Sequence, residues 1–388
     1  MKKTAMTGTE AVANAMRQID PDVVPAYPIT PQTEIMHGYA KFLSDGKVTG
    51  ELIRVESEHS AMSASVGASC AGARVMTATA ANGLALMWEI VYIAASMRLP
   101  IVMSVVNRAL SGPINIHCDH SDSMGCRDSG WIQMYAENNQ EAYENAILGM
   151  RLAEKARLPV MSCLDGFITS HAVEPVTLFE DQSVKDFIGE HIPDHPLLDT
   201  DNPTTHGPLD LFDYYFEHKR KQSQGMFDAK SLFKEVAAEY NQRFGRDIKE
   251  LEEYSMDDAE TVIVALSSTC GTAKVVVDSL REQGKKVGLL KLRLFRPFPM
   301  NEIKEALKSR KVIAVLDRVE SFGAFGGPLF SEIRSALYES GSPKIVNYIY
   351  GLGGREIDTK MIERVYEEIE SYKNKEIEEY IKYLGVRE

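Results

Sequence analysis

The sequence predicts an α/β fold in which a parallel-sheet domain is followed by a smaller α/β domain. Short apolar runs rich in Val and Ile recur between stretches of helical length, and most of these runs have no polar face. Strands that are apolar on both faces are typical of a parallel sheet covered by helices on both sides. A chain of 388 residues is also long for one hydrophobic core, which predicts at least two packed units.

The first domain is expected over residues 1–247. Its strands are predicted from the apolar runs at 23–28, 51–57, 74–80, 100–106 and 158–166. The segment 174–225 breaks this rhythm with several prolines and aspartates, which indicates a long excursion over the surface. A charged helix from about 226 to 245 then leads to an acidic stretch at 247–258, where we expect the domain boundary.

A second alternation predicts the smaller domain over 258–388. Its strands are expected at 261–268, 286–295, 311–319 and 344–351, with helices between them. The tail from about 360 is predicted as one or two charged amphipathic helices. Glycines at 323–327 and 351–354 follow two of these strands without the order G-x-G-x-x-G, so they are expected to form tight turns.

Composition excludes several classes of function. The 43 Lys and Arg against 56 Asp and Glu give a net charge of -13, which would repel nucleic acids and anionic membranes. No apolar run reaches the roughly 18 residues of a membrane span, and no signal segment is evident, so a cytoplasmic location is expected. The five cysteines form no C-x-x-C pair, which indicates reduced thiols rather than disulfides or an iron–sulfur site in this chain.

Polar side chains gather at the carboxyl ends of the predicted strands, where open parallel sheets bind their ligands. Thr30 follows the first strand, Glu58 the second and Arg108 the fourth. A guanidinium and a hydroxyl suit a planar anion, so Arg108 and Thr30 are predicted to hold a small carboxylate. Each residue also has a structural explanation when taken alone: a helix cap for Thr30, a first-turn carboxylate for Glu58 and a surface ion pair for Arg108. Because all three residues are expected at the same edge, or rim, of the sheet, a shared role in a ligand-binding site is favoured over three separate structural roles.

The run His117-Cys118-Asp119-His120 contains three types of metal ligand. Adjacent residues seldom face one ion, and no second cluster follows at a standard spacing. The sequence therefore predicts no metal site here, and a loop flanking an active site is favoured.

Longer motifs show a resemblance to a known family. They lie at 27–33, 55–74, 77–89, 98–123, 127–141 and 292–299. These residues resemble the alpha subunits of pyruvate:ferredoxin oxidoreductases, within the thiamine-diphosphate-dependent 2-oxoacid:ferredoxin oxidoreductases. The resemblance covers essentially the whole chain. It implies a pyrimidine-type thiamine-diphosphate-binding domain, then a transketolase C-terminal-like domain, and the coenzyme A-dependent, reversible oxidative decarboxylation of pyruvate to acetyl-CoA and carbon dioxide with electrons passing to ferredoxin.

The resemblance also implies roles for the rim residues. Glu58 would cross a subunit interface and hydrogen-bond the aminopyrimidine ring of thiamine diphosphate, and Thr30 and Arg108 would bind the substrate carboxylate. The family grips the diphosphate and its magnesium through a G-D-G motif of the beta subunit. This chain has only Leu164-Asp165-Gly166, which departs from that motif.

Partner chains are therefore implied. The resemblance implies beta, gamma and delta subunits or their fused equivalents, with the 4Fe-4S clusters on partner subunits, so the chain alone is expected to be inactive. Ferredoxins are commonly acidic, and we expect ferredoxin to dock on another subunit because this chain is acidic too.

Several alternatives stay open. The loop NRALSGPINIHCDHSDS resembles pyruvate enzymes, but relatives acting on 2-oxoisovalerate, 2-oxoglutarate or oxalate share the scaffold. One or two methylenes change binding by only about 1 to 3 kcal/mol, so the substrate loops need differ little. The chain could instead be a non-catalytic scaffold subunit or a stand-alone small-molecule binding module.

Overall fold

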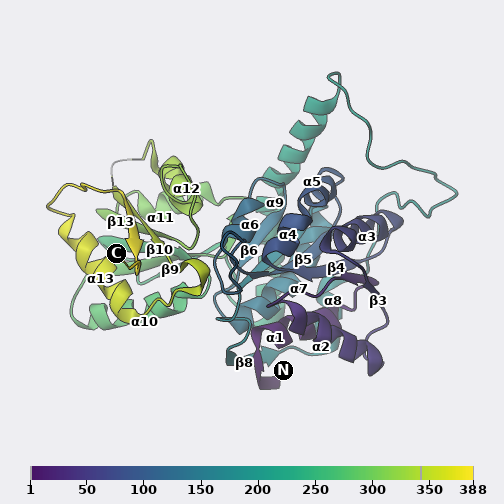
Figure 1. The fold of residues 1–388 in the computed structure, drawn as a ribbon, viewed down its shortest axis with the longest axis horizontal. Helices are drawn as coiled ribbons and strands as arrows, with labels where there is room; N and C mark the ends of the chain where they lie inside the picture. Colours follow the sequence, from purple (N-terminus) through teal and green to yellow (C-terminus); the bar gives the residue numbers. More distant parts are fainter. Residues whose placement is uncertain (1, 341–342, 388) are drawn as a thin grey trace.

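The computed structural model describes residues 2–340 and 343–387 and contains a large parallel sheet near the N-terminus (Figure 1). This sheet has seven strands in the order β12-β6-β7-β5-β4-β2-β3. The strands are β2 (Val23–Ala26), β3 (Glu51–Arg54), β4 (Val75–Thr79), β5 (Ile101–Asn107), β6 (Ile132–Tyr135), β7 (Val160–Asp165) and β12 (Leu294–Arg296). All neighbours pair in parallel except β12, which runs antiparallel to β6.

Both faces of this sheet are covered, as the apolar runs predict. Along β5, Val102 and Val106 enter one hydrophobic core, while Ile101, Met103 and Val105 enter another. The first core is covered by α1 (Gly8–Ile19), α2 (Thr33–Ser44), α7 (Asn139–Ala156) and α9 (Tyr215–Phe244). The second core is covered by α3 (Glu58–Ala71), α4 (Ala81–Leu86) and α5 (Trp88–Ser96). Because side chains alternate along a strand, a strand buried on both faces carries no polar period.

A second sheet lies in the C-terminal part, with six strands in the order β15-β14-β13-β10-β11-β9. The strands are β9 (Leu251–Tyr254), β10 (Thr261–Leu266), β11 (Val287–Leu292), β13 (Val312–Asp317), β14 (Lys344–Tyr350) and β15 (Ile381–Leu384). Helices α10 (Thr269–Glu282) and α13 (Thr359–Ser371) cover one face, and α11 (Met300–Leu307) and α12 (Pro328–Leu337) cover the other. The predicted α/β fold class, with a smaller second α/β part, is confirmed.

The run 286–295 is not the single strand that its continuous apolar pattern predicts. It divides into β11, which pairs in the second sheet, and β12, which crosses to pair with β6 of the first. Arg293 lies at the break, where its N–H donates to Glu250 O at 2.9 Å and its carbonyl accepts from Tyr135 N–H at 2.8 Å. The backbone thus changes its partner sheet at a single residue.

The tail also differs from the prediction of helices alone. After α13 the chain returns as β15, which pairs in parallel with β14. An unpaired edge of β14 offers free N–H and C=O groups, and pairing satisfies them. Pairing with a distant strand thus makes this short charged segment a β-strand, although its sequence pattern favours a helix.

The segment 174–225 is only partly a surface excursion. β8 (Val173–Leu178) pairs with β1 (Lys2–Thr7), and α8 (Asp181–Ile188) buries Val184, Phe187 and Ile188. The part from 190 to 214 has no helix or strand and projects from the body before α9 (Figure 1), which begins at Tyr215 rather than near 226. The division into domains at 247–258 stays a prediction; β9 lies within that segment.

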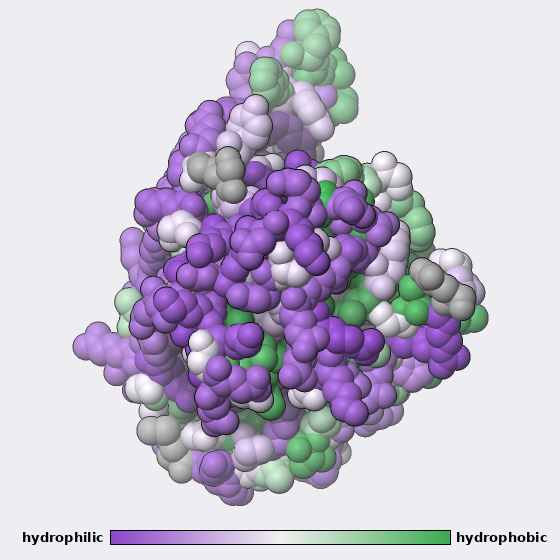
Figure 2. Space-filling view, turned by 90° about the vertical axis from the view of Figure 1, so that its left-hand side faces the viewer, coloured by the Kyte–Doolittle hydropathy of each residue, from purple (hydrophilic) through white to green (hydrophobic). Residues whose placement is uncertain are grey.

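The surface on the side of the second sheet is mostly hydrophilic, with small hydrophobic patches between charged residues (Figure 2). Within the described residues, no helix combines the length and apolarity that a membrane span requires.

Candidate active site

The structure brings Arg108 and Thr30 together at the carboxyl edge of the first sheet. Arg108 follows β5 and is 7% exposed. Its Nη1 donates to Thr30 O at 2.9 Å and its Nε to Asn115 O at 2.8 Å. Both acceptors are neutral carbonyls. Among the described residues, no carboxylate pairs with this guanidinium and no group accepts a hydrogen bond from its Nη2. A buried positive charge with a free donor is therefore available beside Thr30, which is exposed.

Glu58 begins α3, where Ser57 caps the helix by accepting from Ser60 N–H at 3.2 Å. Its carboxylate is largely buried and lies against Gly83. A Cβ built on Gly83 would come within 2.8 Å of Glu58 Oε1 and 2.5 Å of Thr79 Oγ1. The Thr79 hydroxyl is buried without a hydrogen-bond partner in the described structure. A carboxylate and an unpartnered hydroxyl thus lie side by side over a glycine.

Asp122, in the short helix α6 (Ser121–Gly125), links these two parts of the rim. Its Oδ2 accepts from Ala81 N–H at 2.9 Å and Arg108 N–H at 3.0 Å, while Oδ1 accepts from Asn107 Nδ2 at 2.8 Å. Burial raises the pKa of Asp122 to about 6, against the lowering effect of these hydrogen bonds. Asp122 thus connects the start of α4, which lies next to Glu58, to the loop that begins at Arg108. Sequence reasoning missed it, because an aspartate in a polar loop gives no periodic signal.

The four residues 117–120 diverge. The His117 ring packs on Phe167 with centroids 5.0 Å apart, and Asp119 accepts from Ser121 N–H at 2.9 Å. Cys118 and His120 are buried and come together with Asp165, so that their ligand atoms lie within 4.8 Å of one another. This group of three is one that sequence spacing could not reveal, because Asp165 comes from β7.

Asp165 is already fully engaged by protein donors. His120 Nε2 lies 2.8 Å from Oδ1, Arg318 Nη1 donates to Oδ2 at 3.0 Å, and Ser268 N–H donates to Oδ2 at 3.2 Å. Burial would raise its pKa, but His120, Arg318 and Ser268 hold the pKa of Asp165 well below its usual range. The adjacent guanidinium also opposes a cation. This arrangement is a polar joint, that is, a buried hydrogen-bonded contact between the parts of the chain that hold the two sheets, rather than a metal centre. It also explains why Leu164-Asp165-Gly166 offers no free carboxylate.

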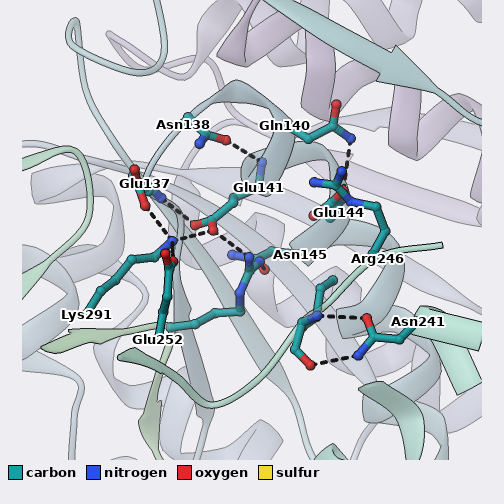
Figure 3. A network of polar contacts seen from close by, with 12 residues as sticks. Glu137, Asn138, Gln140, Glu141, Glu144, Asn145, Asn241, Arg246, Glu252 and Lys291 are labelled. Atoms are coloured by element: carbon teal, nitrogen blue, oxygen red, sulfur yellow. Dashed lines mark hydrogen bonds and ion pairs between the residues drawn. The ribbon is translucent and has the colours of Figure 1, made fainter. Parts of the chain in front are cut away.

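A second polar joint lies further along the same interface (Figure 3). Lys291 of β11 forms ion pairs with Glu137, Glu141 and Glu252, and Arg293 Nη1 donates to Asn145 Oδ1 at 2.6 Å. Arg293 also pairs with Glu141. Burial alone would raise the pKa of Glu141, but Arg293 and Lys291 lower it to about 2. The two sheets are thus fixed to each other by buried charges at two places.

Comparison with known proteins identifies the family. Residues 14–238 match the family described as pyruvate flavodoxin/ferredoxin oxidoreductase, thiamine diphosphate-binding, and residues 259–362 match pyruvate:ferredoxin oxidoreductase core domain II. The chain is 60% identical to pyruvate synthase subunit PorA of Thermotoga maritima, over 100% of this chain and 99% of that protein. It is 48% identical to PorA of Methanocaldococcus jannaschii, over 94% of each chain.

Two further similarities bear on substrate and fold. The ketoisovalerate oxidoreductase subunit VorA of Pyrococcus abyssi is 44% identical over 97% of each chain. A solved 2-oxoglutarate:ferredoxin oxidoreductase from Magnetococcus marinus matches with a TM-score of 0.71 and 22% identity, over 95% of this chain and 65% of that chain, which shows a shared fold. The resemblance seen in the sequence motifs is confirmed: the chain belongs to the pyruvate:ferredoxin oxidoreductase family.

Proposed function

We propose that this chain is the alpha subunit of a multi-subunit pyruvate:ferredoxin oxidoreductase. The assembled enzyme converts pyruvate and coenzyme A to acetyl-CoA and carbon dioxide and passes electrons to ferredoxin, reversibly. Family membership supports the reaction, and the observation that carries the role of this chain is the buried, unpaired guanidinium of Arg108 beside Thr30.

Arg108 and Thr30 bind the carboxylate of the 2-oxoacid. Two carbonyls orient the guanidinium without neutralising it, so its charge and its Nη2 donor remain for an anion. Hydrogen bonds between ionised partners are stronger than neutral ones, and they gain further where water is excluded. The Thr30 hydroxyl adds a short-range donor at the same edge.

Glu58 serves the cofactor. Thiamine diphosphate, when bound, stabilises the carbanion left as carbon dioxide departs from a 2-oxoacid. The residues here suit its aminopyrimidine ring: Glu58 offers a buried carboxylate and Thr79 an unpartnered hydroxyl. Gly83 lets these two side chains pack directly over its backbone, where any larger residue would collide with both. Glu58 would accept and return a proton at a ring nitrogen, which is the work of a positioned acid–base group.

Other groups belong to partner subunits in this proposal. Asp165 is held by protein donors, so the magnesium and the diphosphate are held by a beta subunit. The five cysteines are buried and lie in both parts of the chain, so the 4Fe-4S clusters are carried by partner chains. Gamma and delta subunits, or their fused equivalents, complete the assembly, and ferredoxin docks on one of these partners rather than on this acidic chain.

Exposed apolar side chains supply surface for those partners. Leu86 and Trp88 are exposed at the end of α4, the helix that holds Gly83, and at the start of α5. Further along the chain, Leu209 and Phe212 of the projecting segment and Phe216 at the start of α9 are exposed. Large apolar side chains exposed near a site can be covered by a partner in an assembly. The beta subunit covers the face near Glu58 in this proposal.

Arg108→Ala tests the carboxylate role in the complex purified anaerobically with its partner subunits. Loss of a charged hydrogen bond is expected to raise KM for pyruvate about 100-fold. KM for coenzyme A stays unchanged because that substrate does not use this group. The measurement is 2-oxoacid-dependent viologen reduction, with Arg364→Ala, a variant of an exposed arginine on α13, as the control. An unchanged KM for pyruvate would contradict the assignment.

The same assay on the unmodified complex decides the substrate. Pyruvate, 2-oxoisovalerate, 2-oxoglutarate and oxalate are compared as ratios of kcat/KM, and pyruvate is expected to be preferred. Preference for another acid would keep the family and overturn the substrate. A purified chain that stays monomeric and binds ligand without partners would favour a stand-alone binding module.

A further inference from the structure

Asn115 lies between Arg108 and the second sheet's domain. Its backbone O accepts from Arg108 Nε at 2.8 Å, and its side-chain Nδ2 donates to Gly353 O at 3.0 Å. Its Oδ1 accepts from His117 N–H at 2.7 Å, which fixes the amide orientation. One residue therefore holds the guanidinium with its backbone and the other domain with its side chain.

The contact with the second domain requires glycine. Gly353 and Gly354 lie in the 3₁₀ turn η1 (Leu352–Gly354) after β14, with φ of 58° and 80°. A Cβ on Gly353 would collide with Asn115 Nδ2, and one on Gly354 would collide with His117 Cβ. Gly354 N–H also donates to Cys118 O at 2.7 Å. The glycines predicted as tight turns therefore also form the surface on which the Arg108 loop rests.

We infer that Asn115 is a positioning residue for Arg108, and that through it the η1 turn of the second domain sets the affinity for the 2-oxoacid. The inference rests on the proposed function, in which Arg108 binds the substrate carboxylate. The guanidinium is held at two edges, by Thr30 O from the first sheet and by Asn115 O. A planar group held at only one of these edges can rotate, and its free donor then loses its direction.

Two variants on opposite sides of the contact test this in the assembled complex. Asn115→Ala removes the amide, and Gly353→Ala displaces it from the other domain. Each is expected to raise KM for pyruvate about tenfold with little change in kcat, because the hydrogen bond that anchors Asn115 to Gly353 is lost and the Asn115 carbonyl that orients Arg108 is no longer held in place. KM for coenzyme A stays unchanged. Gly284→Ala is the matched control, since Gly284 has φ of 77° and nothing within 4 Å of the added Cβ.

A double variant separates positioning from a general effect on the loop. Asn115→Ala added to Arg108→Ala is expected to raise KM no further than Arg108→Ala alone, because both act through one guanidinium. Multiplying effects would overturn the inference. So would an unchanged KM in Gly353→Ala, or failure of both single variants to assemble, since a positioning role leaves the fold intact.

The outcomes also separate this inference from the proposed function. If Arg108→Ala itself leaves KM for pyruvate unchanged, the carboxylate role fails and the inference fails with it. If Arg108→Ala raises KM while Asn115→Ala and Gly353→Ala do not, the proposed function stands and the positioning role of Asn115 alone is overturned.

Discussion

Glu58→Ala in the assembled complex is expected to lower kcat for pyruvate about 10³-fold, the typical contribution of a positioned acid–base group. The carboxylate is largely buried against Gly83, and no described residue hydrogen-bonds to it, so its proton-accepting oxygens are not engaged by the protein. The measurement is kcat from viologen reduction with saturating pyruvate, coenzyme A and thiamine diphosphate. KM for pyruvate is expected to change little, which distinguishes Glu58 from Arg108.

Glu56→Ala is the matched control, because Glu56 is an exposed carboxylate two residues away that bonds Ser60. Its activity is expected to match that of the unmodified complex. Wild-type kcat in Glu58→Ala would instead favour the scaffold alternative, in which the polar groups at the strand ends are structural.

Glu141→Gln is expected to lower stability more than any other single change in the polar joint of Figure 3. The variant leaves Lys291 and Arg293 buried with their main counter-charge removed. Removing one partner of a buried ion pair costs about 3–5 kcal/mol. In a chain of this size that loss lowers the melting temperature by about 5 °C. Thermal melts of the complex measure it.

The pH dependence of this effect follows from the pKa of Glu141. Its folded-state pKa is about 2, below the unfolded value of about 4.3. A depressed pKa gives stability that is fully present above the unfolded pKa and lost as pH falls through the folded one. The difference in melting temperature between Glu141→Gln and wild type is therefore constant at neutral pH and shrinks between about pH 4.5 and 2. Glu253→Gln, an exposed neighbour on β9, is expected to melt as wild type.

Sequence patterns predicted the parts of the fold that depend on local periodicity. β5 and β7 are buried on both faces, so their apolar runs read directly as parallel strands. The pairing of Arg108 with Thr30 was also predictable, because both follow strands whose carboxyl ends share one edge.

The features that sequence could not reveal all depend on contacts between distant segments. Asp122 bonds the ends of two strands, and Asn115 bonds a turn more than two hundred residues away in the chain. No spacing rule relates Asn115 to Gly353 before the parts of the chain that hold the two sheets are placed together. The break at Arg293 was hidden for the same reason, since the apolar run continues through it while the backbone changes sheets.

The crossing of β12 limits how the chain can be divided. A fragment cut at the acidic segment 247–258 would contain β6 without β12, and β6 would become an open edge of the first sheet. Exposed strand edges are templates for pairing with other chains. The N-terminal half expressed alone would therefore tend to aggregate, and supplying 294–296 in a permuted or co-expressed piece would protect it. Replacing the C-terminal part by that of another protein would therefore also replace β12, the edge strand of the first sheet.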